Sequence, residues 1–166
     1  MRSITKLSLV VASLILTGTA LQAQTNNASI TATASVQTPI NVVGAQPLNF
    51  GNVFPGVNKT VNATDLTNGG RFDVTGQAST PVTLSFTLPA TLSSGGGNTM
   101  PIVSYSGVYA LVATQVGGFL FAPAAGANPT LSGTGALFVW VGAQVQPATN
   151  QVAGVYTASI IMTVVY

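Results

Sequence analysis

The few charged side chains of this sequence are the first place to look for chemistry. The 166 residues carry four Lys or Arg and two Asp, and they include no Glu, no His and no Cys. Asp65 and Asp73 lie on either side of Asn68-Gly69-Gly70. Two carboxylates at this spacing could flank a calcium ion together with backbone carbonyls, or could form a surface ion pair with Lys59 or Arg71.

Most enzyme chemistry is excluded by the missing residue types. General acid–base catalysis needs a titratable group poised near the working pH, and metal sites need clustered His, Cys or carboxylate ligands. The two Asp residues have no nucleophile with a matched base beside them, and the EF-hand spacing is absent. We therefore expect no enzyme activity, no catalytic residue, no metal and no cofactor, and we favour the ion pair.

Two further groups of residues invite a functional interpretation. Gly95-Gly96-Gly97 has the composition of a phosphate-binding loop, but no Lys follows it, and Pro101 prevents the helix whose N-terminus would hold the anion. The triplet therefore predicts a hairpin tip. Aromatic side chains could stack on sugar rings, but aromatic residues dominate β-sandwich interiors and no acid or amide cluster stands nearby, so we expect core packing. These side chains are Tyr105, Tyr109, Phe119, Phe121, Phe138 and Trp140.

The N-terminus has the pattern of an export signal. Arg2 and Lys6 precede an apolar run from Leu7 to Leu16, and small residues offer cleavage sites, of which we favour the one after Ala23. The apolar run is about ten residues long, whereas a membrane-spanning helix needs roughly 20. We expect a signal peptide over residues 1–23, no retained membrane span, transit through the periplasm, and a final location at the cell surface or outside the cell.

Without this signal the chain is electrically neutral. The remaining 143 of the 166 residues carry two positive and two negative charges. Nucleic-acid binding is excluded because two isolated basic residues cannot neutralise a row of phosphates. An exported domain without cysteine must be stabilised by packing and backbone pairing, and its low charge removes a common protection against association. We therefore expect the domain to associate.

Short apolar runs with a period of two, separated by clusters of Gly, Pro and Asn, predict an all-β fold. Helical spacing is not sustained after the signal, so we expect essentially no helix. We expect one β-sandwich domain over residues 39–166, preceded by an N-terminal extension over residues 24–38. Strands are expected at residues 29–37, 40–43, 48–53, 60–63, 71–75, 82–88, 102–105, 110–115, 119–121, 136–145 and 155–166.

Two segments at the ends of the mature chain carry the most information. Residues 28–37 alternate apolar and mostly hydroxyl side chains, which gives a strand with one apolar face, built around Ile30, Ala32, Ala34 and Val36. Residues 155–166 are largely apolar on both faces. Such a strand fits an interior position, with backbone groups paired on both sides, better than it fits a free edge. Its second partner could come from its own chain or from a neighbouring subunit.

Residues 39–56, with a Leu-x-Phe-Gly step and the turn Pro55-Gly56, resemble the start of a secreted bacterial β-sandwich domain family of unknown function. The likeness continues through residues 72–76, 84–89 and 153–166. The layout also looks like spore coat protein U domains and archaic chaperone-usher pilins, which often carry an early disulfide that this chain lacks. The resemblance implies an immunoglobulin-like, pilin-like sandwich that is completed by the N-terminal strand of the next subunit.

These features together predict an exported structural subunit that builds a pilus-like surface fibre or a coat by donating its N-terminal strand to a neighbouring copy. The predicted donor residues are Ile30, Ala32, Ala34 and Val36. The acceptor groove implied by the pilin resemblance contains Tyr156, Ile160, Met162, Val164 and Tyr166. The predicted partners are other copies of the chain, with a periplasmic chaperone and an outer-membrane usher as further candidates.

One alternative to the fibre remains open. In it, the chain is a monomeric, self-complemented secreted sandwich whose first strand folds into its own sheet. Such a domain would bind a polysaccharide or a matrix partner. The two hypotheses differ in where residues 28–37 find their hydrogen-bonding partners.

Overall fold

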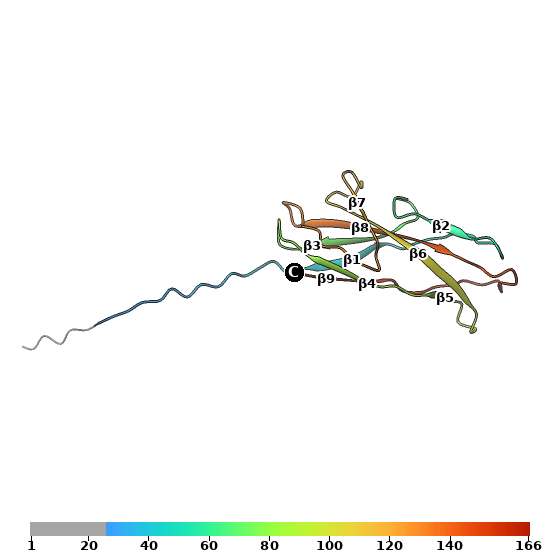
Figure 1. Cartoon of the computed structure of the whole chain (residues 1–166), viewed down its shortest axis with the longest axis horizontal. Helices are drawn as coiled ribbons and strands as arrows, with labels where there is room; N and C mark the ends of the chain where they lie inside the picture. Colours follow the sequence, from blue (N-terminus) through green and yellow to red (C-terminus); the bar gives the residue numbers. More distant parts are fainter. Residues whose placement is uncertain (1–25) are drawn as a thin grey trace, which may run out of the picture. The chain divides into compact units, whose positions relative to one another are not determined.

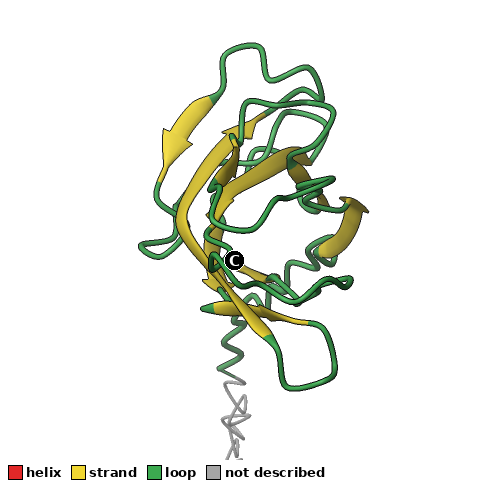
Figure 2. Cartoon of the chain, turned by 90° about the vertical axis from the view of Figure 1, so that its right-hand side faces the viewer, coloured by secondary structure: helices red, strands yellow, loops and turns green. Residues whose placement is uncertain are grey.

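The computed structural model describes residues 26–166, of which residues 36–166 form the folded domain and the residues up to 35 form a separate unit. The described residues contain strands, turns and loops but no helix, which confirms the all-β prediction (Figure 2). Accordingly, they include no apolar helix of the length that crossing a membrane requires. The predicted signal peptide, residues 1–23, lies outside the described residues.

The described residues form nine strands, all paired in antiparallel ladders (Figure 1). The larger sheet has the order β1-β3-β8-β6-β5, with β2 beside β8 and β7 beside β6, and the smaller sheet is the pair β4-β9. The strands are β1 (Asn41–Gln46), β2 (Lys59–Val61), β3 (Gly70–Thr75), β4 (Thr83–Thr87), β5 (Thr91–Ser93), β6 (Thr99–Ala110), β7 (Phe119–Phe121), β8 (Ala136–Val145) and β9 (Ile161–Val165).

The two sheets face each other across the main apolar core. The larger sheet contributes Val74 of β3 and Val139 of β8, and the smaller sheet contributes Leu84 of β4 and Met162 of β9. These four side chains are buried, because alternation along each strand directs every second residue inward. In Figure 1 the β4–β9 pair lies below β1, β3 and β8 of the larger sheet. The arrangement is a two-layer, sandwich-like fold.

A second cluster lies on the outer face of the larger sheet. Trp140 of β8 is completely buried (0% exposed) and shares this cluster with Val108 and Ala63. The chain after β2 passes directly over β8, since a Cβ at Gly142 would lie 2.3 Å from the backbone nitrogen of Ala63. Trp140 therefore packs in a core, as predicted, and presents no face to a sugar ring.

Strand β6 is one long strand where the sequence predicted two. It absorbs an irregularity between Val103 and Ser106, where Ser104 has a φ of 53°. Gly107 is needed in the middle of β6 because the ring of Phe121 packs on it, 2.5 Å from where a Cβ would lie. The predicted strand at residues 110–115 does not form beyond Ala110, where β6 ends. The short strand β5 was not predicted.

Two predicted strands, at residues 29–37 and 48–53, do not form, and a third is shortened. Alternating residues form a strand only where a partner strand is available, and within residues 26–166 neither segment has one. The predicted strand at 155–166 is reduced to β9. The sequence predicted partners on both sides of this closing strand, whereas within the described chain β9 pairs with β4 alone.

Candidate functional site

An open cavity of about 1110 Å³ lies between two loop segments at one end of the sandwich. Its first wall is residues 44–55, which include the end of β1, and its second wall is residues 151–160, which precede β9. Its floor is the inner face of the larger sheet, with Phe72, Met100, Ile102, Val141 and Val145. No residue of β4 or β9 lines the cavity. We call the walls and floor together the groove.

Beyond the end of β1, the first wall is held by single hydrogen bonds and turns instead of by a ladder. The amide of Asn49 donates to the carbonyl of Asn68 at 2.9 Å, and the side-chain oxygen of Asn49 accepts from the amide of Gly51 at 2.8 Å. Gly51 adopts a positive φ of 58°, a conformation that ends an extended run. Pro47 and Pro55 flank the segment and lack amide donors. This part of the wall therefore keeps its shape without pairing to another strand.

The second wall is anchored by Tyr156. Its hydroxyl donates to the carbonyl of Val152 at 2.7 Å and accepts from the side-chain nitrogen of Gln151 at 2.7 Å. One residue later, Thr157 and Ser93 exchange two backbone hydrogen bonds of 2.9 Å, which tie this wall to β5. The groove is therefore preformed on both sides.

The groove is mostly apolar and carries no charge. Partly buried side chains of both walls pack on a buried cluster at its floor, which contains Met100, Ile102, Ala143 and Val145. At the rim, Phe54 is 69% exposed and Val155 is 82% exposed. None of the lining residues is charged. The groove is therefore an unfinished part of the core, suited to an apolar guest.

The free edge of β9 continues the line of the second wall. β9 begins at Ile161, directly after the lining residue Ile160. Within residues 26–166 it is hydrogen-bonded to β4 on one side only. The other edge presents unpaired backbone groups, which are the groups that an added strand uses. The site can therefore supply both apolar contacts and a backbone ladder.

The predicted acceptor residues do not form one surface. Tyr156 and Ile160 line the groove. Met162 is buried in the main core and Val164 packs against it, because both point inward between β9 and the larger sheet. Tyr166 lies beyond the far end of β9, with its hydroxyl bonded to Thr38 and Gln77.

The residues that sequence reasoning missed come mainly from the first wall and the floor. Leu48, Phe50 and Val53 were assigned to a strand of the chain's own sandwich, but they border the groove. Met100 and Ile102 lie on β6, far from the closing strand in sequence. The useful signal was the apolar spacing at 48–53 between Pro47 and Pro55, which indicates an extended wall that cannot join a ladder easily.

The predicted donor residues lie in the described part of the N-terminal extension. Residues 26–40 belong to no strand and no ladder. Ile30 is 96% exposed and Val36 is 95% exposed, and the residues between them are exposed as well. The alternating apolar face is thus present in sequence, whereas no strand forms there.

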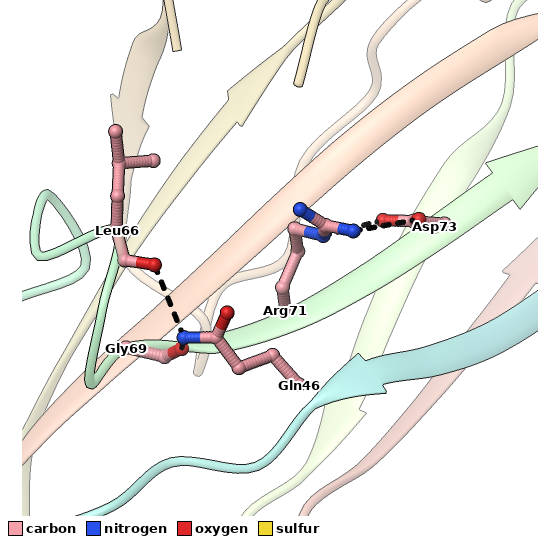
Figure 3. Close-up of polar contacts among 5 residues, drawn as sticks. All are labelled: Gln46, Leu66, Gly69, Arg71 and Asp73. Carbon is pink, nitrogen blue, oxygen red and sulfur yellow. Dashed lines mark hydrogen bonds and ion pairs between the residues drawn. The ribbon is translucent and has the colours of Figure 1, made fainter. Parts of the chain in front are cut away.

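The charged residues hold loops and strands together. Arg71 and Asp73 form an ion pair of 2.9 Å on β3, one of the pairings that the sequence suggested (Figure 3). Asp65 accepts hydrogen bonds from the side chain of Asn68 and from the amides of Asn68 and Thr67, which lower the pKa of its carboxyl below the ordinary value. The carboxylates therefore lie in two separate local networks.

Gln46 closes the loop that contains Asp65. Its side-chain nitrogen contacts the carbonyls of Leu66 and Gly69 at 3.2 and 2.9 Å (Figure 3). It also contacts the carbonyl of Thr67 at 2.8 Å. Gln46 ends β1 and also lines the groove. The loop thus fixes the start of the first wall.

Tyr105 supports the other side of the groove. Its ring packs against the cluster at the groove floor, and its hydroxyl donates to the carbonyl of Pro89, a lining residue, at 2.7 Å. Burial raises the pKa of Tyr105 to about 12, because the phenolate form would lose hydration.

Gly95-Gly96-Gly97 forms the turn between β5 and β6, which confirms the predicted hairpin tip.

The arrangement as a whole suits the binding of an extended apolar segment. The walls are preformed, the floor is apolar, and an unpaired strand edge continues one wall. The sequence matches no protein-family model and no curated protein. The function is therefore inferred from the groove and the N-terminal extension themselves.

Proposed function

We propose that this chain is an exported structural subunit that assembles into a homopolymer, a surface fibre or coat, in which the N-terminal extension of one copy fills the groove of the next. The observation that carries the proposal is the coexistence of two unmatched features in one chain. One is an open apolar groove of about 1110 Å³ beside an unpaired strand edge. The other is an exposed segment with one apolar face that belongs to no ladder.

The two features are complementary in length. A strand over residues 28–36 would span about 30 Å at roughly 3.3 Å per residue. The edge made by residues 155–165, if fully extended, would span about 35 Å on the same basis. A donated strand of this length can pair with the edge along most of its course.

They are also complementary in side-chain character. The donor has larger apolar residues at Ile30 and Val36 and small ones at Ala32 and Ala34. The floor of the groove includes Met100 and Ile102, and no residue of β4 or β9 packs in their cluster. Full burial of the two larger side chains would contribute about 3–6 kcal/mol, and each net backbone hydrogen bond about 1 kcal/mol. The two large anchors should therefore dominate assembly.

The charge distribution favours a neutral partner such as a second copy. All charged side chains of the described residues fall between Lys59 and Asp73, outside both the groove lining and the extension. Recognition must then depend on shape and backbone pairing. An identical subunit supplies the matching strand without any further protein.

The proposal includes an immunoglobulin-like, pilin-like form of the sandwich, which the resemblance of residues 39–56 and 153–166 supports. It also includes export through the periplasm to the cell surface, on the basis of the leader pattern at residues 1–23. A periplasmic chaperone and an outer-membrane usher are proposed as assembly partners. A chaperone of this kind would occupy the groove until the next subunit arrives.

The test is to place charges on the apolar face of the donor. In the full chain, the double substitution Ile30→Asp and Val36→Asp should weaken assembly more than about a hundredfold, because it buries two unpaired charges in the groove. The matched control is Thr33→Asp with Ser35→Asp, which adds the same charge on the opposite face. Sedimentation velocity over a range of concentrations measures both.

The outcomes separate the proposal from its alternative. Assembly of the wild type and of the control, with loss in the Ile30 and Val36 variant, supports donation. A wild-type chain that stays monomeric at every concentration, with residues 28–36 protected from hydrogen exchange, would establish the self-complemented domain instead. Equal assembly of both variants would show that the polymer uses another surface.

A further inference from the structure

The start of the folded domain is fastened to the C-terminal residue. The hydroxyl of Tyr166 donates to the carbonyl of Thr38 and accepts from the amide of Gln77 at 2.7 Å. The amide of Thr38 donates to the side-chain oxygen of Gln77 at 3.1 Å. Both backbone polar groups of Thr38 are therefore engaged. We call these three residues the clamp.

Gly76 packs closely against the clamp. A Cβ at Gly76 would lie 2.8 Å from the Tyr166 hydroxyl, so any larger residue at this position would clash with the tyrosine. Gly76 follows β3, and its backbone is bonded to Gly135 at 2.9 Å. The clamp thus rests on the end of the larger sheet.

The clamp and the groove lie at opposite ends of the same two strands. The chain runs from Ile160 at the groove through β9 to Tyr166 at the clamp, and the five residues of β9 span about 17 Å. β1 starts at Asn41, which pairs with Thr75 beside the clamp, and ends in the first wall of the groove. The extension therefore joins the domain at the end remote from the groove.

This geometry limits how the extension could fill the groove of its own molecule. To bring Ile30 to the groove and keep Val36 near Thr38, the extension would have to double back beside β1 through a turn within residues 37–40. Pro39 has no amide donor and restricts Thr38 to an extended conformation. The clamp already uses both backbone groups of Thr38. Both Pro39 and the hydrogen bonds of the clamp therefore oppose, at Thr38, the turn that self-insertion would need.

We propose that the clamp of Tyr166, Thr38 and Gln77 prevents self-insertion of the extension and so reserves it for a neighbouring subunit. The inference rests on the proposed function, because it explains why the extension of a chain does not occupy the groove of that same chain. A donor strand from another molecule needs no turn at Thr38. With only Gln37 between Val36 and the clamp, neighbouring domains would also be held close together.

The test uses the full chain with Tyr166→Phe, which removes the hydroxyl and keeps the ring. The matched control is Tyr109→Phe, because the Tyr109 hydroxyl has no hydrogen-bond partner among residues 26–166. Gln77→Ala removes the other side of the clamp and carries the test if Tyr166→Phe fails to fold. The readouts are the ratio of monomer to assembled chain and the hydrogen-exchange protection of residues 28–36 in the dilute monomer.

Tyr166→Phe and Gln77→Ala should each raise the hydrogen-exchange protection of residues 28–36 in the monomer by about tenfold. Each should raise the ratio of monomer to assembled chain by a similar factor, because each variant removes one or two net hydrogen bonds of the clamp. The wild type and Tyr109→Phe should leave this segment unprotected. Unchanged protection in both clamp variants would overturn the inference, even if the wild type assembles. A wild type that never assembles would overturn the proposed function. The hydrogen-exchange protection of residues 28–36 in the wild type and the clamp variants would still test whether the clamp prevents self-insertion.

Discussion

The two ends of this sandwich are built from the same sheets and differ in what covers them. At the end that contains the clamp, β4 and β9 close over β3 and β8, and Leu84 and Met162 complete the core. At the end that contains the groove, no strand of the smaller sheet reaches the floor, and Met100 and Ile102 are covered by two loops. One end is a finished core and the other is an unfinished one.

The difference follows from how the chain distributes strand partners. β4 is paired on both sides at the closed end, by β9 and by the bridge between Leu84 and Ala127, whose two backbone hydrogen bonds are 2.8 and 3.2 Å. At the open end, residues 151–156 have no strand partner among residues 26–166. Apolar side chains such as Phe54 and Val155 are exposed at this end, and exposed apolar surfaces mark interaction sites.

The largest effect is expected from breaking the closed end. Leu84→Ala should lower the free energy of unfolding of the subunit by about 2–5 kcal/mol, because it removes a buried side chain from the centre of the main core. Denaturant titration of the dilute monomer measures this change. A loss below about 1 kcal/mol would show that the closed end is no better packed than the open one.

A substitution at the rim of the open end should act on assembly instead of stability. Val155→Ser changes a side chain that is 82% exposed, so the free energy of unfolding of the monomer should move by no more than about 0.5 kcal/mol. Assembly should weaken about tenfold, since a valine contact is lost on strand binding. Sedimentation velocity measures assembly, and an unchanged result would remove the second wall from the interface.

The pH dependence at alkaline values reports on the support of the groove. The folded pKa of Tyr105 is raised to about 12, so its stabilising contribution is complete below the ordinary value of 10.0 and is lost as the pH rises towards 12. Melting temperatures of the wild type should fall over this window. Tyr105→Phe cannot ionise, so its melting temperature should fall less steeply, and parallel curves would contradict the assignment.

The smallest effect is expected at the exposed loop that holds the first wall. The hydrogen bonds to Asp65 lower its pKa, so the stabilisation is present above the ordinary pKa and is lost as the pH falls through the lowered value. Asp65→Asn should flatten the acid limb of the melting-temperature profile slightly. An acid limb of equal slope in both proteins would show that the loop capped by Gln46 does not depend on this carboxylate.

The sequence predicted the closed end better than the open one. β7 and β8 have the predicted bounds. Clear turn signals flank both strands, and both pair with β6 in the same sheet. The alternation at residues 29–37 is just as regular, yet no strand forms there. Periodicity records which residues favour a strand, but it does not say whether a partner strand is present in the same molecule.

The groove illustrates the same limit at the level of single residues. Tyr156 and Ile160, two of the predicted acceptor residues, line the groove. Met162 and Val164 share the same face in sequence, but the core extends under them and not under Ile160. The contribution of Met100 and Ile102 could not be predicted, since it depends on which strands become neighbours across the sheet.

The most direct test of strand donation is a mixed disulfide trap, which is unambiguous because the sequence contains no cysteine. One chain carries Ala34→Cys in the donor face, and a second carries Ala158→Cys in the groove lining. Ala124→Cys, in an exposed loop, replaces Ala158→Cys in the control. Strand donation predicts a disulfide-linked dimer of the first two chains after mixing, and little with the control. A crosslink that forms only within single chains carrying both Ala34→Cys and Ala158→Cys would contradict it.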